Sequence, residues 1–170
     1  DAGNSIIKAK TANDEVDYPH ALHLLSEIEY QNVMTRSGFN GPPPDYMEIN
    51  GAPYVFGESA ERHGTLARRS GAARYTADYY GLIVAGTLAR MFDENLDEVA
   101  VFGSHAPGDV AYRTDLMRAA VGEWRVKTGD SDRIFRVTYA NTFDEPVGGL
   151  MNVLLSDDGL HYNRNDIKDG

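Results

Sequence analysis

The first eight residues carry the side chains with the clearest capacity to bind phosphate. They include a carboxylate, Asp1, and an ammonium group, Lys8, on either side of a small polar turn. The turn residues are Gly3, Asn4 and Ser5. Backbone N–H groups and a lysine bind phosphate oxygens, and a carboxylate can hold hydrated Mg²⁺. The octet therefore predicts a loop for the phosphates of a nucleotide, although a Gly-Asn-Ser turn is also a common hairpin connector.

The histidines are the other candidates for chemistry. His20 and His23 have a spacing that would put two imidazoles on one helix face, but Pro19 and the lack of a nearby carboxylate motif argue against a zinc site. His105 follows an apolar run, where it either lines a ligand cleft or is an ordinary loop residue. A hydrolytic pair of His105 with Asp109 lacks a serine elbow or a metal ligand set.

Composition excludes several classes of function. The chain has 170 residues, enough for one domain with at most a small appendage, and its hydrophobic fraction of 42% is ordinary for a globular protein. A formal net charge of −10 opposes direct binding to nucleic acid or to anionic lipid. The absence of cysteine excludes disulfides and thiolate chemistry, and no run of 18 apolar residues predicts a membrane span.

Two hairpins are predicted in the first third of the chain. Strands at 6–10 and 16–18 flank a polar turn, and Pro19 ends the second strand because proline cannot donate to a ladder. A second hairpin, over 46–56, turns at the dipeptide Asn50-Gly51, which supplies the positive φ angles of a two-residue turn. The stretch 35–44 is rich in glycine and proline, which predicts an exposed loop, and 22–28 gives no firm prediction.

The remaining pattern predicts helices packed on a sheet. The apolar residues of 75–92 cover most of the helix circumference, which is typical of a buried helix. The unbroken apolar run 99–102 predicts a strand covered on both faces of a parallel or mixed sheet. A second helix, strands at 122–126 and 134–141, and a helix at 150–155 follow. We therefore predict a mixed α/β fold with a small β-rich insertion at roughly 28–70.

Several motifs, taken in order, resemble a known family. They are Asp-x-Gly-Asn-x-x-x-Lys at the start, Asn-Gly-x-Pro-Tyr-Val-Phe-Gly-Glu-Ser-Ala, Val-Ala-Val-Phe-Gly-Ser-His-Ala-Pro and Glu-Pro-Val-Gly-Gly-Leu. Together with the buried helix they are similar to actin-like ATPases, above all to the N-terminal half of prokaryotic plasmid-segregation proteins of the ParM type. The resemblance spans essentially all 170 residues. It implies a ribonuclease-H-like fold, a mixed sheet flanked by helices, with residues near 28–70 as a small outer subdomain.

The resemblance also implies roles for the opening octet. Gly3, Asn4 and Ser5 would donate hydrogen bonds to the β- and γ-phosphates of ATP. Lys8 would pair with phosphate charge, and Asp1 would organise Mg²⁺ through water. The family's second phosphate loop and its adenosine-binding segment would lie beyond Gly170, so this piece alone is expected to bind ATP weakly or not at all.

A catalytic carboxylate is implied near the other end of the chain. Glu145 stands three residues before Gly148, where the family carries a Gln or Glu that orients the water attacking the γ-phosphate. Asp144 is the neighbouring candidate. Without the resemblance, Glu145 is a first-turn carboxylate that favours a helix dipole.

The implied function is ATP hydrolysis coupled to polymerisation. Nucleotide would bind between two halves and control cytoplasmic filaments that move plasmid or other DNA through an adaptor protein rather than by direct contact. The basic residues Arg62, Arg68 and Arg69 form either a solvated loop or part of a contact with the next protomer. The alternatives are a non-polymerising ATPase of the Hsp70-like or sugar-kinase-like kind, and a catalytically silent scaffold module of the same fold.

Overall fold

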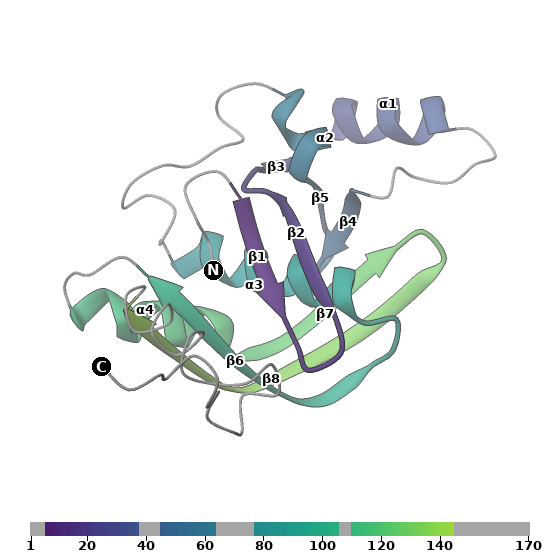
Figure 1. Ribbon diagram of the computed structural model, residues 1–170. Coiled ribbons are helices and arrows are strands. Elements are labelled where there is room, and N and C mark those ends of the chain that lie inside the picture. The colour runs from purple at the N-terminus through teal and green to yellow at the C-terminus, as the bar shows by residue number, and fades with distance from the viewer. Residues whose placement is uncertain (1–5, 38–44, 64–76, 106–109, 145–170) are drawn as a thin grey trace, which may run out of the picture.

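The computed structural model describes residues 6–37, 45–63, 77–105 and 110–144 (Figure 1). The strands are β1 (Ile6–Lys10), β2 (Glu15–Pro19), β3 (Leu22–Leu24), β4 (Tyr46–Ile49), β5 (Ala52–Phe56), β6 (Leu96–His105), β7 (Gly122–Thr128) and β8 (Ser131–Asp144). The helices are α1 (Glu27–Ser37), α2 (Gly57–Glu61), α3 (Ala77–Met91) and α4 (Val110–Ala120). The order of the elements confirms the predicted mixed α/β fold.

The described strands form two sheets. β1 and β2 make a two-stranded antiparallel sheet, and the other strands make a six-stranded sheet in the order β3-β5-β4-β7-β8-β6. Within that sheet β6 and β8 are parallel, and the remaining described pairs are antiparallel. The predicted mixed sheet is therefore present, and its parallel pair lies at one edge.

Tight turns connect the antiparallel strands. Asn50 and Gly51 have φ angles of 50° and 82°, as the two central positions of the predicted hairpin turn require. A second two-residue turn, Gly129-Asp130, joins β7 to β8, and Gly129 has a φ of 57°. The sequence predicted two short separate strands in that region, whereas β7 and β8 are longer and form one continuous hairpin.

Helix α3 is the centre of the main core. Its residues 79–81 and 83–89 are all buried, which confirms the predicted buried helix. Two glycines allow this close packing, because a Cβ at Gly81 would collide with α4 and Trp124, and a Cβ at Gly86 would collide with Phe56. The main core unites α3 and α4 with the strands around them. Its buried members are Ile7, Tyr18, Leu22, Met47, Ile49, Phe56, Tyr79, Tyr80, Ile83, Val84, Ala85, Leu88, Ala89, Leu116, Ala120, Val126, Phe135, Val137 and Ala140.

The carboxyl end of α3 is fixed by a buried arginine. Arg133 of β8 donates hydrogen bonds to the carbonyl oxygens of Ala89, at 3.0 Å, and of Phe92. Carbonyls in the last turn of a helix lack partners within the helix, so a buried cation there satisfies them and complements the helix dipole. This contact ties α3 to the central hairpin of the sheet.

One sequence prediction about β6 is wrong. The apolar run 99–102 was expected to be covered on both faces, but Phe102 is 62% exposed. Its ring lies 5.7 Å, between centroids, from that of Tyr139, which is itself 50% exposed. Tyr139 lies on β8, the strand next to β6, so the two rings lie together on an uncovered part of one sheet face. An apolar run does not show whether both faces of a strand are covered.

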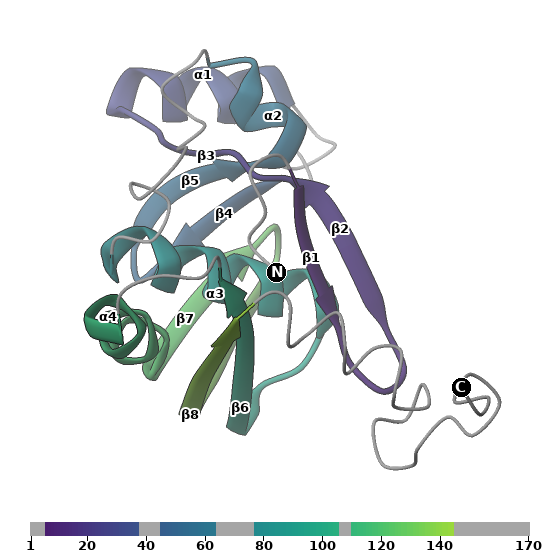
Figure 2. The ribbon, with the colours of Figure 1, turned by 60° about the vertical axis from the view of Figure 1, so that its left-hand side comes forward.

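A smaller hydrophobic cluster is separate from the main core, and residues of α1 and α2 take part in it. We call it the outer cluster; its buried members are Ala21, Leu25, Tyr46, Val55 and Ala60. Figure 2 shows α1 and α2 beside β3 and β5. The undecided stretch 22–28 holds β3 and the start of α1. Residues 35–37 of the predicted loop are helical, and the rest of that loop lies outside the described residues.

The boundaries 28 and 70 of the predicted insertion stay a prediction. The strands within those bounds, β4 and β5, continue the six-stranded sheet, and β3 joins that sheet from outside them. In the ranges that the structure describes, no helix is long and apolar enough to cross a membrane.

Candidate functional site

The β1–β2 hairpin positions the chain that leaves the predicted phosphate loop. Its turn forms because the Thr11 N–H donates to the carbonyl of Asp14 at 2.7 Å, while the Thr11 hydroxyl accepts from the Asp14 N–H at 3.0 Å. Ile7 and Tyr18 pair across the hairpin and both enter the main core. The sequence prediction of this hairpin is confirmed.

Tyr18 anchors the hairpin to α3. Thr87 has one hydroxyl proton, which it donates to the Ile83 carbonyl at 2.7 Å, so the Tyr18 hydroxyl is the donor in its 2.7 Å bond to Thr87. Burial raises the pKa of Tyr18 to about 12, because the charged phenolate would lose its hydration. The guanidinium of Arg90 lies over the same ring at 4.4 Å from the centroid.

Arg90 extends this anchor toward the outer cluster. Its Nη2 lies 2.6 Å from the Asp45 carboxylate, just before β4. Asp45 in turn accepts a 2.8 Å hydrogen bond from the hydroxyl of Ser59 in α2. A continuous chain of polar contacts thus joins the hairpin and α3 to the residue before β4 and to α2.

The ends of two parallel strands form a second part of the site. β6 and β8 run in register to their last residues, where Ser104 pairs with Phe143 and His105 with Asp144. The segments that follow these two strands therefore start at the same edge of the sheet, which is where α/β folds place ligands.

The structure describes one of the predicted nucleotide-site residues. Lys8 is exposed on β1, and its Cα faces that of Asp17 on β2. His105 and Asp144 end their strands beside each other, as the register shows. The other predicted site residues lie outside the described residues; they are Asp1, Gly3, Asn4, Ser5, Asp109 and Glu145.

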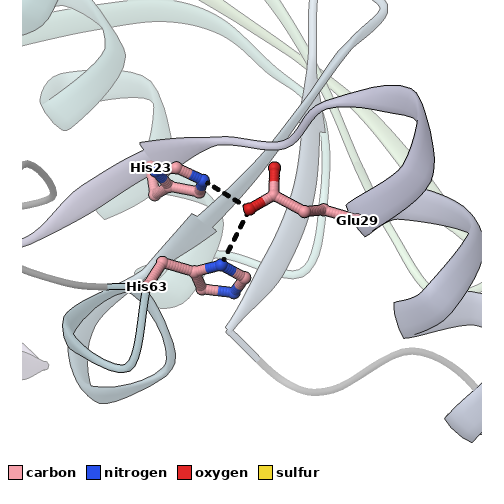
Figure 3. Close-up of side chains that lie close together, drawn as sticks. All are labelled: His23, Glu29 and His63. Atoms are coloured by element: carbon pink, nitrogen blue, oxygen red, sulfur yellow. Dashed lines mark hydrogen bonds and ion pairs between the residues drawn. The ribbon is translucent and has the colours of Figure 1, made fainter.

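The histidines are not arranged as their spacing in the sequence suggested, because His20 and His23 do not share a helix face. His20 is buried beside Tyr79, with ring centroids 5.5 Å apart, and it lies outside any helix. His23 lies in β3 and contacts Glu29 of α1 and His63 beyond α2 (Figure 3). The carboxylate that the sequence argument did not find near His23 is therefore present, six residues along the chain.

The sequence matches the model of a known protein family over most of its length. The family described as actin-like proteins, N-terminal domain, matches residues 1–148. The chain belongs to this family of actin-like proteins. Among curated proteins none matches the chain significantly.

Solved structures of actin-like proteins share the fold. Apo ParM of pSK41 is 16% identical, with a TM-score of 0.68, over 91% of this chain and 50% of that one. Alp7A is 12% identical, with a TM-score of 0.60, over 95% of this chain and 48% of that one. AlfA, solved as a filament bound to AMPPNP, is 15% identical, with a TM-score of 0.59, over 91% and 56%. The actin-like chain thus spans about half the length of these structures.

Sequence reasoning missed the residues that hold the hairpin in place. Tyr18 and Thr87 are 69 positions apart, and Arg90 and Asp45 are 45 apart. No local pattern links residues at such separations, so only the folded chain reveals them. The buried, apolar character of α3 was the one signal that a nearby tyrosine would pack against it.

Proposed function

We propose that this domain forms one wall of the nucleotide cleft in an actin-like ATPase. The observation that carries the proposal is the family match over residues 1–148. The arrangement of the strands supports it, because the parallel strands β6 and β8 end beside each other, as strands at the ligand sites of α/β folds do.

The opening octet would bind the phosphates of ATP. Lys8 is an exposed cation on a strand anchored through Ile7 in the main core, and this fits the binding of a phosphate group. Gly3, Asn4 and Ser5 would donate hydrogen bonds to the β- and γ-phosphates. Asp1 would hold a water of Mg²⁺, which neutralises phosphate charge when it is bound.

Glu145 would act on the attacking water. It directly follows β8, whose last residue Asp144 pairs in register with His105 of β6. A carboxylate there can accept a hydrogen bond from water and so orient the lone pair of the water oxygen toward the γ-phosphate. Asp144 is the competing candidate, so a test has to separate the two.

The protein that carries this domain would also polymerise. AlfA was solved as a filament bound to AMPPNP, which supports a link between nucleotide and assembly in this family. The net charge of −10 favours attachment to DNA through an adaptor over direct contact with it. We therefore propose cytoplasmic filaments for DNA segregation, with growth controlled by the nucleotide state.

ATP turnover tests the site, measured in the protein that carries this domain together with a second ATPase half. Glu145→Ala should lower kcat by about 10²- to 10⁴-fold, because it removes the group that positions and activates water. Asp144→Ala should keep most of the wild-type kcat. Lys8→Ala should raise KM, while Lys10→Ala, on the same face of β1, serves as its matched control. Unchanged turnover in Glu145→Ala contradicts the catalytic assignment.

Light scattering separates the polymer from its alternatives. A rise in scattering on addition of ATP supports the filament protein, and turnover without such a rise supports a monomeric ATPase. Absence of both turnover and ATP binding in the two-half protein supports a silent scaffold module instead.

A further inference from the structure

Three side chains of the kinds that ligate metals meet among residues that the proposed nucleotide site does not use. His23 comes from β3, Glu29 from the first turn of α1, and His63 from the segment just after α2 (Figure 3). The His23 Nε2 and the His63 Nδ1 each lie 3.2 Å from the same Glu29 oxygen, Oε1. The two imidazole rings are stacked, with centroids 4.6 Å apart and planes at 14°. The three ligand atoms lie within 4.8 Å of one another.

We propose that His23, Glu29 and His63 bind one divalent transition-metal ion of the zinc type. Two imidazole nitrogens and one carboxylate oxygen form a donor set that suits Zn²⁺ and Co²⁺ and suits Mg²⁺ poorly. Metal–ligand distances of about 2.0–2.1 Å put neighbouring ligand atoms of a tetrahedral site about 3.3 Å apart. Both nitrogen–oxygen distances of 3.2 Å are already close to that spacing.

The carboxylate is held ready by contacts that leave one oxygen for the metal. Glu29 Oε2 accepts hydrogen bonds from the Ser26 backbone N–H at 2.8 Å and from the Ser26 hydroxyl at 2.7 Å. Oε1 is turned toward the two imidazoles (Figure 3). Such outer hydrogen bonds orient a ligand and reduce the entropy lost when the metal binds.

The imidazoles can exchange their hydrogen bonds to Glu29 for metal bonds. In the metal-free geometry the His23 Nε2 and the His63 Nδ1 face a carboxylate oxygen, so both carry their protons there. On metal binding that proton would move to the other ring nitrogen or to water, and the nitrogen would offer its lone pair to the ion. The side chains of His23 and His63 are 24% and 26% exposed, so an ion and a water as fourth ligand can reach them.

The ion would join three elements of the region around the outer cluster. α1 buries little apolar surface, and Ile28 and Met34 on it are 75% and 40% exposed. A metal bridging α1 to β3 and to the end of α2 would therefore add stability where packing supplies little. This inference is independent of the nucleotide site, whose Mg²⁺ needs oxygen ligands from other residues.

Metal titration tests the proposal directly. The protein is purified without a polyhistidine tag, stripped with a chelator, and titrated with Zn²⁺ by calorimetry and with Co²⁺ by visible absorption. We expect one ion per chain, cobalt bands of tetrahedral intensity that Zn²⁺ abolishes, and no heat from Mg²⁺. Failure to bind one Zn²⁺ per chain overturns the site whether or not the protein hydrolyses ATP.

Three variants locate the ion. Glu29→Gln and His63→Gln should each weaken Zn²⁺ binding by at least about tenfold. Glu27→Gln, in the same first turn of α1, is the matched control and should leave the affinity unchanged. A glutamine at position 29 can still cap the helix, and His63 is exposed, so both variants should fold, as circular dichroism would verify. Zn²⁺ affinity that is equal in His63→Gln and the wild type contradicts the assignment.

Discussion

Helices α1 and α3 are stabilised in different ways. α3 is buried along nearly its whole length between the sheet, α4 and the β1–β2 hairpin. α1 lies on the outside of the molecule, with Ile28 75% exposed, and only Tyr30 and Val33 of α1 pack on the outer cluster. The main core is therefore held by apolar burial, whereas α1 depends on local polar contacts. A region of the second kind opens locally at lower free energy and responds more to ligands.

The largest expected effect comes from truncating a large side chain in the main core. Phe135 of β8 is fully buried, and Phe135→Ala should lower the free energy of unfolding by about 3–5 kcal/mol, because it removes a ring and leaves a cavity. Urea denaturation of the purified domain measures this change.

A smaller truncation, in the outer cluster, is Val55→Ala. Val55 is 2% exposed, but the change removes only two methyl groups, for an expected cost of about 1.5 kcal/mol. Equal losses in the two variants would mean that the outer cluster is as important to global stability as the main core, and the comparison would fail.

Alkaline pH provides a second test, at the anchor of the hairpin. Burial raises the pKa of Tyr18 from 10.0 to about 12, so the stability gained by keeping it neutral is fully present below pH 10. It is lost as the pH rises through about 12, and the full loss is on the order of 2–3 kcal/mol. Tyr18→Phe cannot ionise, so its stability should fall less steeply.

The measurement is urea denaturation of both proteins between pH 9 and 11. By pH 11 the wild type should have lost about 1 kcal/mol more than Tyr18→Phe. The other tyrosines titrate in both proteins, so their effect cancels in the difference. Parallel curves would mean that Tyr18 is already accessible to water and that the hairpin is not tightly docked on α3.

The sequence predicted the elements whose causes are local. The Asn50-Gly51 turn and the apolar surface of α3 are properties of neighbouring residues, and both were found. The exposure of Phe102 was not predictable, because the cover on a sheet face depends on which distant segments pack there. The helix start at Ser26 was missed although its signal was present, since serine followed three positions later by Glu29 is a capping box.

The candidate sites show the same difference between features with local causes and features that depend on distant residues. The place of Lys8 on a strand after the polar turn was predicted from its neighbours, and the structure has it there. The roles of Asp1, Gly3, Asn4, Ser5 and Glu145 stay predictions, because these residues lie outside the described ones. The contact between His63 and Glu29 joins residues 34 positions apart, and no spacing rule reaches that far.

The smallest expected effect lies at the capping box of α1. The Ser26 hydroxyl accepts the Glu29 backbone N–H at 3.4 Å and donates to its carboxylate at 2.7 Å. Ser26→Ala removes both bonds and should cost about 1 kcal/mol of α1 stability. Because few apolar contacts hold α1, the loss should appear as local opening rather than as global unfolding. Hydrogen exchange should therefore speed up about fivefold for the α1 amides, and the α3 amides should keep their rates. Faster exchange in both helices would show that α1 and α3 open as one unit, and the distinction between the two regions would be wrong.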